Sequence, residues 1–83
     1  MRAYVLIQAQ IGAVADATRA LRGLIGSDLV DLVEGPYDIV ARIEDEATEE
    51  EVLRLCGAPP FIRALPCRLR ERASVRTEDH DKE

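Results

Sequence analysis

The run Gly35-Pro36-Tyr37-Asp38 holds the residues whose types and spacing are best suited to chemistry. Glycine accepts backbone angles that other residues avoid and the proline ring fixes φ near a turn value, so Gly35 and Pro36 predict a tight turn. A carboxylate just after a turn at the end of a sheet, such as that of Asp38, could accept hydrogen bonds from an ammonium group. Backbone amides around Gly35 could meet a carboxylate. The alternative is that Asp38 accepts from backbone amides of its own turn and has only a structural role.

Side chains that could serve as a nucleophile, a base or a metal ligand are few and scattered. The single histidine, His80, lies in an acidic stretch, which indicates a solvated side chain rather than a metal ligand. Cys56 and Cys67 show no CxxC spacing, and we interpret both as small, buried apolar groups. Further carboxylates surround the expected start of a helix, where they favour the helix dipole and face water: Glu44, Asp45, Glu46, Glu49, Glu50 and Glu51. We therefore expect no enzyme activity, no cofactor and no metal site.

The charge and the hydropathy of the chain exclude several classes of partner. The 83 residues carry a net charge of −5, which argues against nucleic-acid binding because phosphate neutralisation needs an excess of Lys and Arg. No apolar run approaches the ~20 residues that span a bilayer, and no cleavage site follows the apolar N-terminal run, so we expect a cytoplasmic protein. The arginines near the C-terminus are interpreted as the solvated face of an edge strand: Arg68, Arg70, Arg72 and Arg76.

Hydrophobic periodicity predicts four strands and two helices that would position the turn. Thr48 and Glu51 form a capping box, which predicts the start of the second helix, and Pro59-Pro60 stops it. Pro66 places the last strand at a sheet edge or at a bulge, because proline cannot donate to a β-ladder. The expected elements are a strand at 3–10, a helix at 13–24, strands on either side of the turn within 29–44, a helix from 48 and a strand at 61–70.

This order of elements predicts an α+β domain, the ferredoxin-like β-α-β-β-α-β sandwich with both helices on one face of an antiparallel sheet. Alternate residues of the strands, such as Val5, Ile7 and Ile39, are expected to pack under the helices. The other face has no cover within the chain, and soluble monomers seldom expose such an apolar patch. We therefore predict that two sheets pack face to face as a dimeric α+β barrel through these residues: Tyr4, Leu6, Gln8 and Val40.

Two segments of the chain resemble the effector-binding domain of the Lrp/AsnC transcription regulators, also called the RAM domain. They are Ala3-Tyr4-Val5-Leu6-Ile7-Gln8 and Gly35-Pro36-Tyr37-Asp38-Ile39-Val40-Ala41-Arg42-Ile43-Glu44, and the likeness in element order runs from residue 2 to residue 70. Members of this family dimerise through their sheets, often assemble further, and bind amino acids near the turn between the second and third strands. The resemblance therefore implies a ligand-binding role for Gly35, Tyr37 and Asp38.

The last strand departs from the family pattern. In many relatives a Thr-x-Thr pattern on this strand helps to hold the ligand, and the matching positions here are Ala64-Leu65-Pro66. Ala64 and Pro66 are thus candidate ligand contacts that lack the hydroxyl groups, and we expect an affinity of only about 0.1 to 1 mM. No helix-turn-helix precedes the module, so the sequence resembles the stand-alone members of the family, and we expect it not to bind DNA itself.

The residues and the resemblance leave three candidate functions, which fold class alone cannot separate. We favour a non-catalytic regulatory module, residues 1–71, that forms a homodimer or a higher oligomer. It would sense a small amino-acid-like effector or co-assemble with a full-length Lrp/AsnC regulator. The alternatives are a small dimeric α+β barrel enzyme and a purely structural oligomerisation domain. Residues 72–83 are expected to form a disordered, charged tail.

Overall fold

The computed structural model describes residues 3–68 of the chain. The expected tail at 72–83, which includes His80, Arg72 and Arg76, lies outside the described residues, as does Arg70. Within them, strands and helices follow one another in the predicted order. Their bounds are β1 Ala3–Ala9, α1 Val14–Ile25, the short 3-10 helix η1 Ser27–Leu29, β2 Val30–Leu32, β3 Ile39–Ile43, α2 Glu46–Leu55 and β4 Phe61–Arg68.

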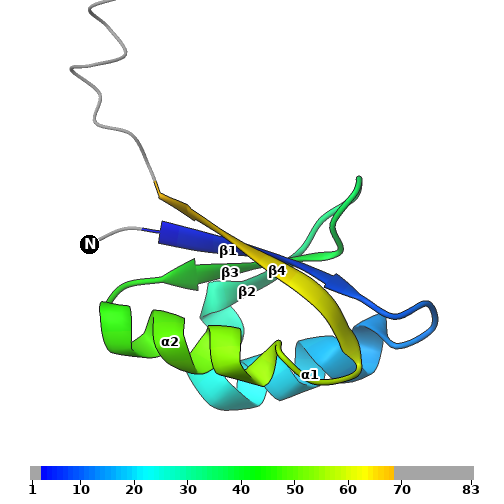
Figure 1. The fold of residues 1–83 in the computed structure, drawn as a ribbon, viewed down its shortest axis with the longest axis horizontal. Helices are drawn as coiled ribbons and strands as arrows, with labels where there is room; N and C mark the ends of the chain where they lie inside the picture. The colour runs from blue at the N-terminus through cyan, green and yellow to red at the C-terminus, as the bar shows by residue number, and fades with distance from the viewer. Residues whose placement is uncertain (1–2, 69–83) are drawn as a thin grey trace, which may run out of the picture.

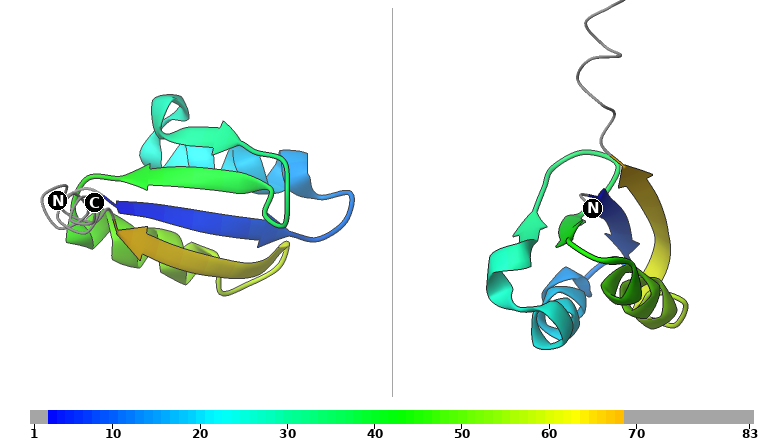
Figure 2. Two further views of the ribbon diagram at one scale, coloured as in Figure 1. Left: turned by 90° about the horizontal axis from the view of Figure 1, so that it is seen from above. Right: turned by 90° about the vertical axis from the view of Figure 1, so that its left-hand side faces the viewer.

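The four strands form one sheet in the order β2-β3-β1-β4, and every neighbouring pair is antiparallel. The segment 33–38 joins β2 to β3, longer than the tight turn that was predicted, whereas each helix connects two strands that are separated by one other strand. Both helices lie on the same face of the sheet (Figures 1 and 2). The chain is thus a small α+β domain with a four-stranded antiparallel sheet and two helices, consistent with the predicted ferredoxin-like fold.

The core lies between the sheet and the helices and is built from alternate residues of the central strands. On β1, Val5 and Ile7 are fully buried, while their neighbours Leu6 and Gln8 on the opposite face stay partly exposed. This period of two confirms the predicted faces of the first strand. The other large side chains that are fully buried come from both helices and from β2 and β3: Leu21, Val30, Ile39, Ile43 and Val52.

The start of α2 differs from the prediction. The helix begins at Glu46, and its N-cap is Asp45, whose Oδ1 accepts a hydrogen bond of 2.8 Å from the backbone N–H of Thr48. The predicted capping box with Thr48 at its start is therefore wrong by three residues. Aspartate is as good an N-cap as threonine, and its carboxylate reaches the free N–H of the third helical residue, so the helix starts at the earlier signal.

The interpretation of Glu49 as a residue that faces water is also wrong, whereas Arg68 is exposed on the edge strand β4, as predicted, and in addition pairs with Glu49. Arg68 stands opposite Ala3 in the sheet, on the side that the helices cover, and its Nη2 binds Oε1 of Glu49 at 2.9 Å. Glu49 is only 7% exposed, because this contact ties the first turns of α2 to the end of β4. Pro66 does lie on an edge strand, as predicted, since β4 is the last strand of the sheet order.

Candidate functional site

The face of the sheet that carries no helix, called here the outer face, presents a row of apolar side chains across its middle. Leu6 on β1 stands opposite Val40 on β3 and opposite Leu65 on β4. The view from above shows the strands side by side with both helices behind them (Figure 2, left). Leu65 is 46% exposed, and Leu6 and Val40 are covered only in part. We name these three residues the middle row.

The rows on either side of the middle row carry polar as well as apolar groups. Tyr4 stands between Arg42 and Cys67, and Gln8 stands opposite Arg63. The predicted interface residues Tyr4, Leu6, Gln8 and Val40 are therefore brought together on one face. The prediction missed the contribution of β4, although Leu65 and Cys67 alternate with Ala64 and Pro66 in the sequence, which is the signal that would have found it.

A second group lies at the end of the sheet where β2 turns into β3, called here the turn end. Gly35 has φ of +130° and is exposed, a backbone conformation that strains any residue with a side chain. Tyr37 and Asp38 precede the first residue of β3, so both belong to the turn rather than to the strand. Both are partly exposed.

Asp38 is bound to the central strand and to its own turn by three hydrogen bonds. Its Oδ2 accepts from the backbone N–H of Ala9 at 2.9 Å, and its own N–H donates to the carbonyl of Ile7 at 2.9 Å. Its carbonyl accepts from the N–H of Val33, also at 2.9 Å. The carboxylate thus binds a residue 29 positions away in the sequence, so the interpretation that it accepts from its own turn is wrong. Its role is nonetheless structural in part.

Arg63 joins the turn end from β4, and sequence reasoning did not find it. Its guanidinium carbon lies 5.4 Å from the centroid of the Tyr37 ring, a cation–π contact. Arg63 is exposed and, among residues 3–68, makes no hydrogen bond or ion pair through its side chain. Only the register of β4, which pairs Arg63 with Gln8, brings this residue to the turn.

Ala64 and Pro66 are not part of the turn end. Ala64 stands opposite Ile7 and packs against the buried core, so its side chain points away from the outer face. Pro66 stands opposite Val5, two residues further along β4 and further from the turn. Of the five predicted ligand contacts, the structure groups Gly35, Tyr37 and Asp38, which are neighbours in the sequence, and leaves the two β4 residues apart.

The two cysteines differ in their surroundings. Cys56 is buried, as predicted, and burial raises the pKa of its thiol to about 11. Cys67 is only partly covered and belongs to the outer face, so the prediction that it is buried is wrong for the isolated chain. No group of three or more His, Cys, Asp and Glu side chains that could hold a metal ion occurs among residues 3–68.

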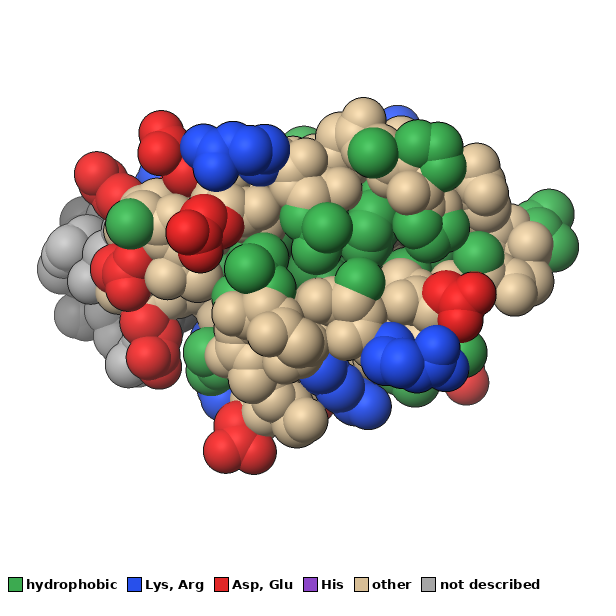
Figure 3. All heavy atoms as spheres, turned by 90° about the horizontal axis from the view of Figure 1, so that it is seen from below, with side chains coloured by type: hydrophobic (Ala, Val, Ile, Leu, Met, Phe, Trp, Pro, Cys, Tyr) green, Lys and Arg blue, Asp and Glu red, His purple; other side chains and the backbone are tan. Residues whose placement is uncertain are grey.

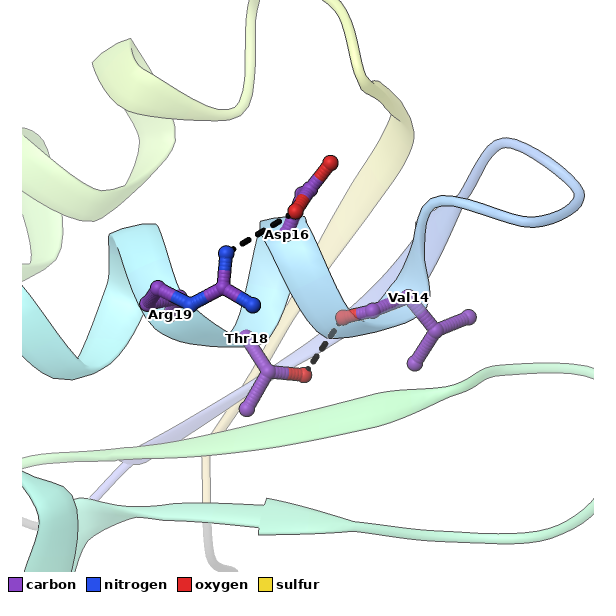
Figure 4. A network of polar contacts seen from close by, with 4 residues as sticks. All are labelled: Val14, Asp16, Thr18 and Arg19. Carbon is purple, nitrogen blue, oxygen red and sulfur yellow. Dashed lines mark hydrogen bonds and ion pairs between the residues drawn. The ribbon is translucent and has the colours of Figure 1, made fainter.

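Among residues 3–68, hollows flank α1 on the helix side of the molecule, two of them lined in part by its residues. The larger, of about 850 Å³, lies between α1 and the edge strand β2 and is lined by Val14, Thr18, Arg22, Leu32 and their neighbours. At its rim Thr18 donates to the carbonyl of Val14 at 2.7 Å, and Arg19 pairs with Asp16 at 2.9 Å (Figure 4). These short-range contacts stabilise the helix itself.

The smaller hollow lies between the two helices and has a volume of about 530 Å³. Apolar side chains gather along the helix side of the molecule (Figure 3), and Leu24 and Leu55 contribute to the lining of this hollow. Glu51 and Arg54 stand at its edge. Across residues 3–68, neither helix has the length and apolar character needed to cross a membrane.

Comparisons with known proteins support the fold and leave the function open. A scan against protein-family models and a search of the curated proteins find no match. Among solved structures, the crystal structure of TTHA0845 from Thermus thermophilus matches with a TM-score of 0.69 and 24% identity, over 84% of this chain and 92% of that chain. The crystal structure of the hypothetical protein PHS023 from Pyrococcus horikoshii matches with a TM-score of 0.61 and 14% identity, over 99% of this chain and 98% of that chain. At these identities the likeness concerns the fold alone.

Proposed function

We propose that this chain is a non-catalytic regulatory module that pairs with a second copy through its outer face. In the pair, two sheets would face each other as a dimeric α+β barrel. The module would sense a small amino-acid-like effector at the turn end, or co-assemble with a full-length Lrp/AsnC regulator. The observation that carries the proposal is the middle row of Leu6, Val40 and Leu65, which no helix of the described chain covers.

The chemistry of the outer face supports a second copy as its cover. Apolar side chains in the centre with polar groups at the margin are the usual anatomy of a protein–protein interface. Here the middle row is bordered on one side by Gln8 and Arg63 and on the other by Arg42. A domain of this size also buries a modest share of its own surface, so burial of a further apolar face adds stability that the monomer lacks.

The effector part of the proposal is supported by the turn end. Tyr37 offers an aromatic surface, Asp38 a carboxylate with one oxygen bound to Ala9, and Gly35 a stretch of exposed backbone. An aromatic ring and a carboxylate in neighbouring residues at the end of a sheet offer both an apolar surface and a charge to a small polar ligand. This support is independent of the dimer, so each part has its own test.

Substitution of Leu6 by Asp tests the dimer. We expect the wild type to run as a dimer in light scattering, and Leu6→Asp to run as a monomer, because a charge buried between the sheets costs several kcal/mol. The matched control is Ile11→Asp, since Ile11 is fully exposed in the connection between β1 and α1. Circular dichroism should show that both variants are folded. A folded, dimeric Leu6→Asp variant would contradict the proposed arrangement.

Thermal unfolding in the presence of each of the twenty amino acids tests the sensor. A compound that binds only the folded state raises the melting temperature according to its concentration and affinity. We expect one or a few amino acids, at about 10 mM, to produce such a shift. If none does while the dimer is present, the effector part fails and a purely structural or co-assembly role remains.

A further inference from the structure

Arg63 differs from most other described arginines in how it uses its charge. In four of the others the guanidinium group donates a hydrogen bond to an oxygen atom of the protein: Arg19 to Asp16, Arg22 to Val30, Arg42 to Asp28 and Arg68 to Glu49. Within the described part of the chain, that of Arg63 contacts only a ring, at 5.4 Å from the Tyr37 centroid, and is exposed. Its charge is therefore not neutralised within residues 3–68.

The contact with Tyr37 orients this cation without using its hydrogen-bond donors. A cation–π contact attracts the guanidinium to the ring without occupying its N–H donors, which remain able to bind an acceptor. A planar fork of N–H donors matches the two oxygens of a carboxylate and binds them with two parallel hydrogen bonds. Arg63 is thus presented in a form suited to a carboxylate that comes from outside the domain.

The surroundings of Arg63 supply both a neutral and a negative group. Gln8 stands opposite Arg63 on β1, and Asp38 binds the next residue of β1, Ala9, from the other side of that strand. Asp38 and Arg63 form no ion pair with each other, since no N···O contact within 4.0 Å joins them among the described residues. The turn end therefore holds two opposite charges that do not neutralise each other, which is the arrangement that a zwitterion requires.

We infer that Arg63 is the residue that binds the carboxylate of the effector, and that Tyr37 is a positioning residue for its guanidinium. The inference rests on the proposed function and makes it more specific: the effector carries a carboxylate, and the group that holds it is a side chain of β4. The amides around Gly35, which the sequence suggested for this role, become secondary contacts.

Calorimetry with the amino acid that raises the melting temperature tests the inference. We expect Arg63→Gln to weaken binding by about ten- to a hundredfold, as for the loss of a charge-assisted hydrogen bond. Tyr37→Leu should weaken it by a smaller factor, because the arginine remains but is no longer held in place. The matched control is Arg54→Gln, which removes an exposed arginine from α2 and should leave the affinity unchanged.

The amide of the same amino acid separates a carboxylate contact from a general structural effect. The amide lacks the negative charge, so the wild type should bind it about as weakly as Arg63→Gln binds the acid. Arg63→Gln should then bind acid and amide alike. If Arg63→Gln binds the acid as tightly as the wild type, the inference is wrong and the proposed function stands. If no amino acid binds the wild type, both the effector proposal and this inference are wrong, whereas the dimer is judged separately by light scattering.

Discussion

At the residue scale, the last backbone N–H of β1 donates to a side-chain carboxylate in place of a backbone carbonyl of the neighbouring strand. β3 begins at Ile39, so no β3 carbonyl pairs with the N–H of Ala9, and Oδ2 of Asp38 takes that place at 2.9 Å. Ala9 is buried, and a buried N–H without a partner costs free energy comparable to a lost hydrogen bond. The carboxylate therefore extends the sheet by one bond and fixes the path of the turn.

Replacement of Asp38 by Ala should lower the free energy of unfolding by about 1 to 3 kcal/mol, because the N–H of Ala9 loses a charged acceptor. Asp38→Asn should cost less, about 0.5 to 1.5 kcal/mol, since an amide oxygen can still accept from Ala9. Urea unfolding of the three proteins measures both values.

The control for Asp38 is Glu34→Ala, which removes a carboxylate from the same turn. Glu34 is exposed and has no hydrogen-bond or ion-pair partner among residues 3–68, so we expect its removal to change stability by less than about 0.5 kcal/mol. Equal stability of Asp38→Ala and Glu34→Ala would show that the bond to Ala9 contributes nothing.

At the element scale, α2 depends on its N-cap. The backbone N–H of Thr48 donates to Asp45, and this bond holds the pKa of the Asp45 carboxyl below its usual value of 3.8. Asp45→Ala should therefore lower the melting temperature at pH 7, and Asp45→Asn should lower it less because its oxygen still accepts.

The pH dependence of this cap has a definite sign. The pKa of Asp45 is lower in the folded than in the unfolded chain, so its stabilisation is complete above 3.8 and is lost as the pH falls through the lower folded value. The difference in melting temperature between wild type and Asp45→Asn should thus be constant near neutrality and shrink below pH 3.8. A difference that grows in acid would contradict the role of the cap.

The sequence predicts those features that depend on local periodicity. The alternation of apolar and polar residues along β1, together with the turn and helix-stop signals Gly-Pro and Pro-Pro, predicts the strands, the helices and their order. The ferredoxin-like arrangement follows from that order. Contacts between distant residues are not visible in this way. The pairs Asp38 with Ala9, Arg68 with Glu49, and Arg63 with Tyr37 each depend on how strands distant in the sequence pair in the sheet, which the periodicity of a single segment does not show.

At the scale of the whole molecule, the two faces of the sheet differ in how they are covered. One face is filled by α1 and α2, with Val5 and Ile7 fully buried beneath them. The other keeps Leu65 nearly half exposed beside Leu6 and Val40. Within residues 3–68, helices therefore cover one face of the sheet only, and in the proposed dimer a second copy would cover the other face.

The reactivity of the Cys67 thiol in the wild-type protein can show whether the outer face is covered. Cys67 lies on the outer face opposite Tyr4 and is partly exposed in the single chain. The only other cysteine, Cys56, is 6% exposed, and its pKa of about 11 leaves it mostly protonated at pH 8. Because thiolates and not thiols react with disulfide reagents, the fast reaction at pH 8 belongs to Cys67.

The rate of this fast reaction should fall as the protein concentration rises. If only the monomer exposes Cys67, the rate follows the monomer fraction, which drops to about a tenth at roughly 50 times the dimer dissociation constant. Leu6→Asp should react at the same rate at every concentration, and Cys67→Ala should retain only the slow reaction of Cys56. A wild-type rate that does not depend on concentration, in a protein that light scattering shows to be dimeric, would place the interface elsewhere than on the outer face.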